Sequence, residues 1–139
     1  MARAILPLMH TWRAAVLNQD KAGLVRVALP EAREGIGEAL EDKSSPLWKS
    51  LFAGSRSFRA FLEDPSTRIA VFEHHLILGS HYQVTACFFR DELQWPTNYL
   101  ALQELVKRRT VRCLDWVFGE EGEWFVSYGF GMPERVPRR

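Results

Sequence analysis

The strongest constraint on the fold of this 139-residue chain is a change in hydrophobic spacing near Thr67. Before that residue, apolar side chains recur every three or four positions, which is the spacing of helices that bury one face. After it, apolar and polar residues alternate in runs rich in β-branched and aromatic side chains, which is typical of strands. Helices followed by an antiparallel sheet indicate an α+β fold whose sheet comes mainly from the C-terminal half.

Apolar spacing and helix-start signals predict five helices before the change. Asp20 is expected to cap the second helix, and Ser45 the fourth, because their side-chain oxygens can accept hydrogen bonds from free backbone N–H groups. The run 99–109 suits either a helix or a strand, and we prefer a helix because its basic end, Lys107 to Arg109, favours a helix C-terminus. The five expected helices span residues 3–18, 21–29, 31–42, 46–53 and 57–63.

Two antiparallel hairpins are predicted after the change. The first turns tightly at Gly79, which would set Leu76 opposite Gln83 and Phe72 opposite Cys87. The second is rich in aromatic residues on both faces, so we expect it to lie centrally in the sheet and to be covered on both sides. The expected segments are 68–78 and 81–91 for the first hairpin and 111–130 for the second.

Charges nearly cancel along the chain, with 18 Lys and Arg against 17 Asp and Glu and a net charge of +1. This balance lacks the basic excess of a nucleic-acid-binding domain, so no nucleic-acid partner is expected. No apolar run is long enough to cross a bilayer, so no membrane is expected either. Hydrophobic residues make up 47% of the chain, as in globular proteins. We expect one domain over residues 1–132, followed by a basic tail, 133–139.

Cysteine usage indicates the compartment. Cys87 and Cys113 lack a CxxC motif, so we expect both to be small core residues without a disulfide, in a reducing compartment. The N-terminal segment lacks the long apolar stretch of a signal peptide. These features predict a cytoplasmic protein.

Asp115 is the first candidate for chemistry. The predicted turn, 119–122, would set Asp115 opposite Val126, on an apolar face with Trp124 and Tyr128. A carboxylate in such surroundings is expected to have a raised pKa, which a general acid or base near neutral pH requires. The alternative, which we favour, is structural: Asp115 pairs with an Arg or Lys, or lies near a frayed edge of the sheet.

The first hairpin carries a second candidate group. Strand alternation sends Glu73, His75 and Tyr82 to one face, where an acid and a histidine could act together on a pocket wall. His74 and His81 go to the other face. Because a zinc site needs at least three converging ligands, no metal is expected, and no motif for a cofactor is present. The alternative for these histidines is a solvated strand end.

Two stretches resemble the NTF2-like, or SnoaL-like, superfamily. LMHTWRAAVLNQDKAGLVRVALP (8–30) is similar to its opening helix, break and second helix, and WVFGEEGEWFVSYGF (116–130) is similar to its closing hairpin. The resemblance implies helices that cover a curved antiparallel sheet and close a cone-shaped cavity. It also implies acidic catalytic residues on the cavity side of late strands, and dimers formed through the outer sheet face.

Two functions are therefore predicted. The first is a pocket for a small hydrophobic ligand, with Asp115 and His75 as acid/base groups for isomerase-, dehydratase- or cyclase-like chemistry. The second is a non-catalytic partner-binding protein of the immunity or adaptor type, which forms a homodimer through the outer sheet face. The residues expected to bind the ligand are Trp12, Glu73, Tyr82, Phe88, Trp124 and Tyr128.

Overall fold

The computed structural model describes residues 2–78, 81–90, 96–108, 111–119 and 121–128. The side chains at positions 2, 72–78, 81 and 99 lie outside this description, as does the predicted basic tail.

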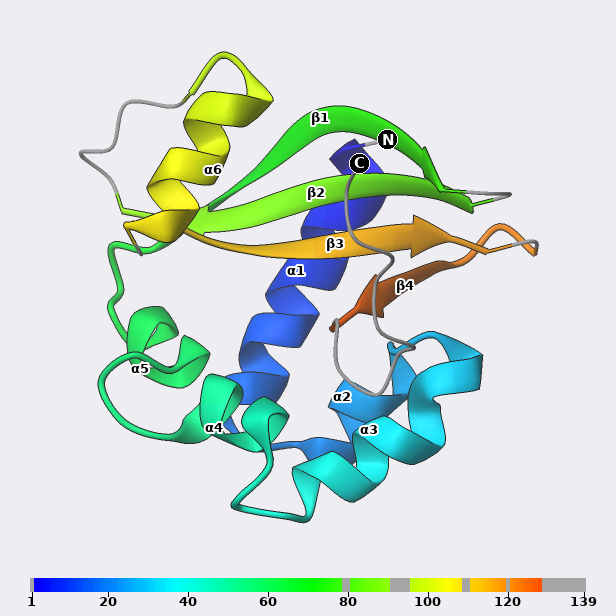
Figure 1. Ribbon diagram of the computed structural model, residues 1–139, viewed down its shortest axis with the longest axis vertical. Helices are drawn as coiled ribbons and strands as arrows, with labels where there is room; N and C mark the ends of the chain where they lie inside the picture. The colour runs from blue at the N-terminus through cyan, green and yellow to red at the C-terminus, as the bar shows by residue number, and fades with distance from the viewer. Residues whose placement is uncertain (1, 79–80, 91–95, 109–110, 120, 129–139) are drawn as a thin grey trace.

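Helices and strands occupy separate layers, and α1 crosses behind the sheet in Figure 1. The described helices are α1 (Ala2–Leu17), α2 (Lys21–Arg26), the 3-10 turn η1 (Pro30–Ala32), α3 (Arg33–Leu40), α4 (Pro46–Phe52), α5 (Phe58–Leu62) and α6 (Tyr99–Lys107). The described strands are β1 (Arg68–Leu78), β2 (His81–Phe89), β3 (Val111–Phe118) and β4 (Trp124–Ser127). They form one antiparallel sheet in the order β1-β2-β3-β4. The predicted α+β class is confirmed.

Local signals place the helix ends. Asp20 accepts a hydrogen bond from the Gly23 N–H, and Ser45 accepts one from the Trp48 N–H, so both predicted caps are confirmed. The preference for a helix over 99–109 is also confirmed, and Asn98 caps it by accepting from the Ala101 N–H.

The predicted register of the last hairpin is wrong by one residue. The Gly119 N–H donates to the Glu123 carbonyl, and Gly122 has a φ of +84°, which together close a loop longer than the predicted turn. Asp115 therefore lies opposite Ser127, not Val126. Because side chains alternate between faces, this single step moves Trp124, Val126 and Tyr128 to the face away from Asp115.

The first hairpin follows the predicted register only near its turn. Leu76 lies opposite Gln83 as predicted, but an irregularity before Leu76 sets Phe72 opposite Thr85 instead of Cys87. This shift is by two residues, so residues 68–71, before the irregularity, keep their expected faces. The predicted turn at Gly79 lies outside the described residues.

The main core lies between α1–α5 and one face of the sheet. Trp12 sits at its centre, with its ring 5.1 Å from Phe58 and 6.0 Å from Phe88. Trp116 of β3 is fully buried and its Nε1 donates to the Met9 sulfur at 3.2 Å. Aromatic side chains of α1 and of the two central strands thus pack together, and this packing holds α1 against the sheet.

Tyr128 links the end of β4 to this core. Its hydroxyl accepts from Trp12 Nε1 and donates to the Leu24 carbonyl, both at 2.9 Å. Burial raises the pKa of Tyr128 well above its ordinary value of 10.0, and the hydrogen bond from Trp12 opposes that rise. The Val126 N–H also donates to the Val27 carbonyl, so α2 and the residues after it cover the edge of β4.

A Tyr128→Phe substitution should destabilise the protein by about 1–3 kcal/mol, because it leaves the buried Trp12 N–H and the Leu24 carbonyl without their partner. Urea unfolding, followed by tryptophan fluorescence, measures this change. The dependence of the unfolding free energy on urea should stay that of the wild type. A loss below the experimental error would show that water replaces the hydroxyl.

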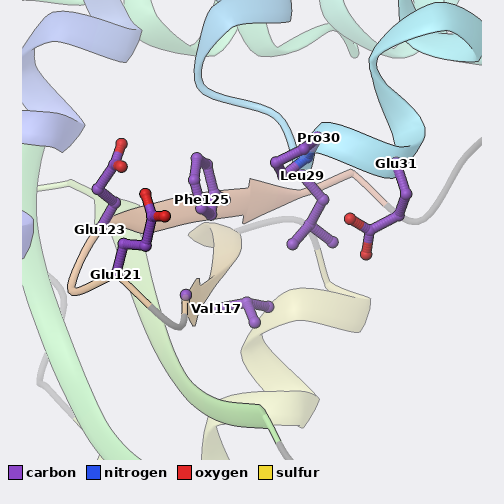
Figure 2. A pocket seen from close by; sticks show the side chains of 8 residues that line it. Leu29, Pro30, Glu31, Val117, Glu121, Glu123 and Phe125 are labelled. Atoms are coloured by element: carbon purple, nitrogen blue, oxygen red, sulfur yellow. The ribbon is translucent and has the colours of Figure 1, made fainter.

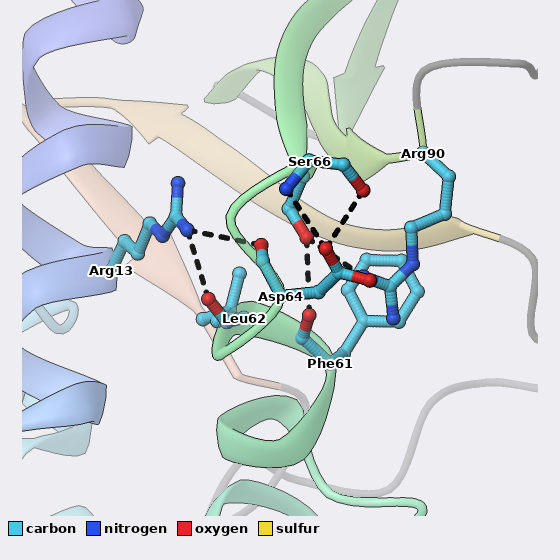
Figure 3. A network of polar contacts seen from close by, with 7 residues as sticks. Arg13, Phe61, Leu62, Asp64, Ser66 and Arg90 are labelled. Atoms are coloured by element: carbon cyan, nitrogen blue, oxygen red, sulfur yellow. Dashed lines mark hydrogen bonds and ion pairs between the residues drawn. The ribbon is translucent and has the colours of Figure 1, made fainter.

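Asp64, after α5, joins α1 to the start and end of the first hairpin (Figure 3). Arg13 of α1 donates to the Leu62 carbonyl at 2.9 Å, while the Asp64 carboxylate lies 2.7 Å from Arg90, which follows β2. The Ser66 backbone N–H, then its hydroxyl, and the Arg90 guanidinium lower the pKa of the Asp64 carboxyl below its ordinary 3.8. Arg90 also stacks over the Phe61 ring at 4.2 Å.

Asp64→Asn should make stability less sensitive to acid. A carboxyl whose pKa is lowered by folding stabilises the protein above its unfolded pKa, and this contribution is lost as the pH falls below about 4. The urea midpoint at pH 5 and at pH 3 measures the effect. Asp42→Asn should also make stability less sensitive to acid, because hydrogen bonds from Ser44 lower the pKa of the Asp42 carboxyl in the same way. An unchanged acid loss in Asp64→Asn would contradict this account.

Candidate functional site

The outer face of the sheet carries a second, smaller core under α6. Cys87 of β2 lies opposite Cys113 of β3, and the two form a disulfide. Leu102 of α6 and Val111 of β3 are buried against this disulfide. The expectation of two unbonded cysteines is therefore wrong, because their pairing follows from the register of β2 and β3, which no local motif records.

A cleft of about 390 Å³ opens between α6 and the outer face of β2 and β3. Asp115 is half-buried there, and Thr85 Oγ1 donates to its Oδ1 at 2.8 Å. No other described group donates a hydrogen bond to this carboxylate. The cleft is lined by Thr85, Leu102, Gln103, Val106, Lys107, Cys113 and Asp115.

The two described charged groups that line the cleft differ in their exposure to solvent. Lys107 is 74% exposed at the rim and lies 3.6 Å from Glu104, one turn earlier on α6. Asp115 forms no ion pair with any described Lys or Arg, so the structural pairing favoured from the sequence is replaced by the Thr85 hydroxyl. The cleft therefore offers a carboxylate with one oxygen engaged, next to apolar side chains of α6.

Most of the residues predicted to bind a ligand lie elsewhere. Trp12 and Phe88 are buried in the main core, and Tyr128 uses its hydroxyl within that core. Tyr82 and Trp124 lie on the core face near the last hairpin turn, with their rings 6.1 Å apart. None of these five lines the Asp115 cleft, because four of them lie on the core face of the sheet and Trp12 belongs to α1, which covers that face.

Glu73 and His75 belong to β1, but their side chains lie outside the described residues. The grouping of His75 with Asp115 stays a prediction.

Sequence reasoning missed Thr85, Gln103, Lys107 and Cys113 as members of the site. One signal was available: Thr85 and Cys87 are two residues apart, as are Cys113 and Asp115. In an antiparallel pair, aligning the cysteines also aligns Thr85 with Asp115. Gln103 and Lys107 carried no such signal, because only the packing of α6 on the sheet brings them to the cleft.

A second pocket of about 390 Å³ lies beside the last hairpin (Figure 2). Phe125, Leu29 and Pro30 form its apolar floor, with Glu121 and Glu123 on one side and Glu31 on the other in Figure 2. All three carboxylates are exposed to solvent. This pocket can attract cations, but its described lining residues include no buried polar group comparable to the Thr85–Asp115 pair.

Comparison with protein-family models, with curated proteins and with solved structures finds no match for this chain. Among the described residues, no group of three or more His, Cys, Asp or Glu side chains is placed to hold a metal ion. Every helix in the described ranges is too short or too polar to reach across a lipid bilayer.

Proposed function

We propose that this protein binds a small, largely apolar molecule in the cleft under α6, and that Asp115 recognises an N–H donor or an ammonium group on it. The observation that carries the proposal is the Thr85–Asp115 pair, which opens into an otherwise mostly apolar cleft. Ligand sites commonly combine an apolar lining with a few convergent polar groups.

The ligand class follows from the chemistry of the lining. Thr85 occupies one carboxylate oxygen of Asp115, which leaves the second oxygen to accept from a ligand donor. Leu102 and Val106 provide the surface for an apolar body. A half-buried carboxylate binds a positively charged donor more strongly than a neutral donor, because charge-assisted hydrogen bonds are stronger where water is partly excluded.

We propose binding rather than turnover as the main activity. Acid/base catalysis of the isomerase, dehydratase or cyclase type requires a proton donor and a proton acceptor at the reacting atoms. Among the described residues, Asp115 is the single carboxylate that lines the cleft, and the other titratable group there, Lys107, lies at the exposed rim. The acid/base role of Asp115 with His75 remains the less supported form of this proposal.

We also propose membership of the NTF2-like, or SnoaL-like, superfamily. A cytoplasmic location stays a prediction, and the Cys87–Cys113 disulfide removes the unbonded cysteines from which a reducing compartment was expected. Helices that precede and cover an antiparallel sheet support the proposed membership. The cone-shaped cavity of that superfamily is its finer part, and it would require the core face to open a pocket that Trp12, Phe88 and Trp116 now fill.

Titration with phenethylamine and with phenethyl alcohol tests the binding proposal, since the two share an apolar body and differ in charge. In two-dimensional ¹H–¹⁵N NMR spectra, the amine should shift the amides of Thr85, Gln103 and Asp115. We expect the amine to bind about tenfold or more tightly than the alcohol, because a hydrogen bond to a charged group contributes about 1.5–3 kcal/mol.

Asp115→Asn should remove the preference for the amine, since the amide keeps the shape of the carboxylate but not its charge. Glu31→Gln is the matched control, because it removes one carboxylate from the second pocket and leaves the cleft unchanged. Equal binding of amine and alcohol to the wild type, or amine-induced shifts confined to Phe125 and Glu121, would overturn the proposal.

A second candidate function is partner binding without catalysis, through the outer side of the sheet. The observation that favours it is Leu100 of α6, which is 77% exposed, together with Val106 at 41%. Exposed apolar side chains on the helix that covers this face would be protected from water in a homodimer.

Light scattering over a range of protein concentrations tests the dimer. The wild type should approach twice the chain mass of 16.1 kDa, and Leu100→Gln should shift it toward the monomer. Lys21→Gln, on the opposite side of the sheet, should leave the mass unchanged. A wild type that stays monomeric at all concentrations would exclude the homodimer.

A further inference from the structure

The two sulfurs of the Cys87–Cys113 disulfide lie in different surroundings. Cys87 is fully buried in the small core with Leu102 and Val111. Cys113 is half-buried and lines the open cleft. A reagent that enters the cleft therefore contacts Cys113, which lines the cleft, whereas Cys87 is not among the lining residues.

We propose that this disulfide is a thiol–disulfide exchange site, attacked at Cys113 by a dithiol that enters the cleft. Exchange proceeds by attack of a thiolate on one sulfur of a disulfide, so access to that sulfur limits its rate. Because Cys113 lines the cleft and Cys87 does not, the incoming thiolate attacks at Cys113.

The reaction has two steps. The incoming thiolate bonds to Cys113 Sγ while the Cys87–Cys113 bond breaks, and Cys87 leaves as a thiolate that takes up a proton. The second thiol of the reagent then attacks the reagent's own sulfur in the mixed disulfide, forms the reagent's internal disulfide and releases Cys113, which takes up a proton. The cysteine pair gains the two electrons and two protons that the dithiol loses.

The charged groups around the cleft act on the first step in opposite directions. Lys107 attracts an incoming thiolate, whereas Asp115 repels it. A reagent with a cationic or neutral body suits this cleft better than an anionic one.

Reduction would change the cleft as well as the cysteines. Leu102 and Leu105 of α6 pack on the small core that contains the disulfide, and α6 makes its principal described contacts with β3. Asp115 lies two residues after Cys113 on the same face. Breaking the Cys87–Cys113 disulfide between β2 and β3 therefore weakens the packing of α6 on the sheet. This regulatory consequence rests on the ligand-binding function proposed above.

The first experiment treats the folded wild-type protein with dithiothreitol without denaturant, then alkylates it with iodoacetamide and measures its mass. We expect both cysteines to be alkylated at a rate proportional to the dithiothreitol concentration. A rate equal to that of global unfolding, measured on the same protein in urea and extrapolated to water, would show that the disulfide is a closed structural bond and would overturn the proposal.

The second experiment compares two single variants with Ellman's reagent. In Cys87→Ser the remaining thiol is Cys113, and in Cys113→Ser it is the buried Cys87. We expect the Cys113 thiol to react at least about tenfold faster, because labelling follows exposure. Equal rates would overturn the assignment of Cys113 as the point of attack. The wild-type reduction above needs no variant, so it decides the exchange even where a variant unfolds.

The third experiment follows hydrogen exchange by mass spectrometry before and after reduction. Amides of α6 should exchange faster in the reduced protein, while those of α3, on the other side of the sheet, should keep their rates. Unchanged exchange in α6 would overturn the regulatory consequence. These readouts use no cleft ligand, so their failure is separate from a failure of the phenethylamine titration.

Discussion

The pairing of β2 with β3 is the interaction on which the described site depends. It sets Cys87 opposite Cys113 and Thr85 opposite Asp115 on one face, and Ala86 opposite Leu114 on the other. Because the side-chain period of a strand is two residues, a single register fixes both faces at once. The hydrogen bonds between β2 and β3 thus position both the side chains that face the core and the side chains that line the cleft.

The side chains on the two faces of β3 are buried in different surroundings. Toward α1, Leu114 and Trp116 are packed in an apolar core, whose indole N–H groups are satisfied by Met9 and Tyr128. Toward α6, Asp115 stays half-buried next to the disulfide, where the Thr85 hydroxyl is its described partner. A carboxylate placed on the first face would lose its hydration without compensation, whereas on the second it keeps contact with the cleft.

The expected helices and strands could be predicted because each carries its own local signal. The side chains of Asp20, Ser45 and Asn98 cap helices at the residues where hydrophobic spacing begins, and the alternating runs became strands. Asp115 was also found from the sequence, since an acid in an alternating apolar strand stands out. The site around it was not found, because Trp124 and Tyr128 were placed beside Asp115 by a hairpin register that is wrong by one residue, and no local signal indicated that α6 packs over this face.

The sequence by itself determined the α+β order, the capped helix starts at Asp20 and Ser45 and the presence of an acid on a central strand, since these depend on backbone preferences and spacing within one segment. It did not determine every helix boundary: the expected helix 21–29 ends at Arg26, and the expected helix 31–42 is a 3-10 turn, Pro30–Ala32, followed by the helix Arg33–Leu40. Only the tertiary structure decided the disulfide, the Thr85–Asp115 hydrogen bond and the seat of α6 over the cleft. These depend on loop closure at Gly119 and Gly122 and on the alignment of strands far apart in the chain. One additional residue in the loop moves every side chain of the following strand to the opposite face of the sheet, and no local sequence pattern indicates this change.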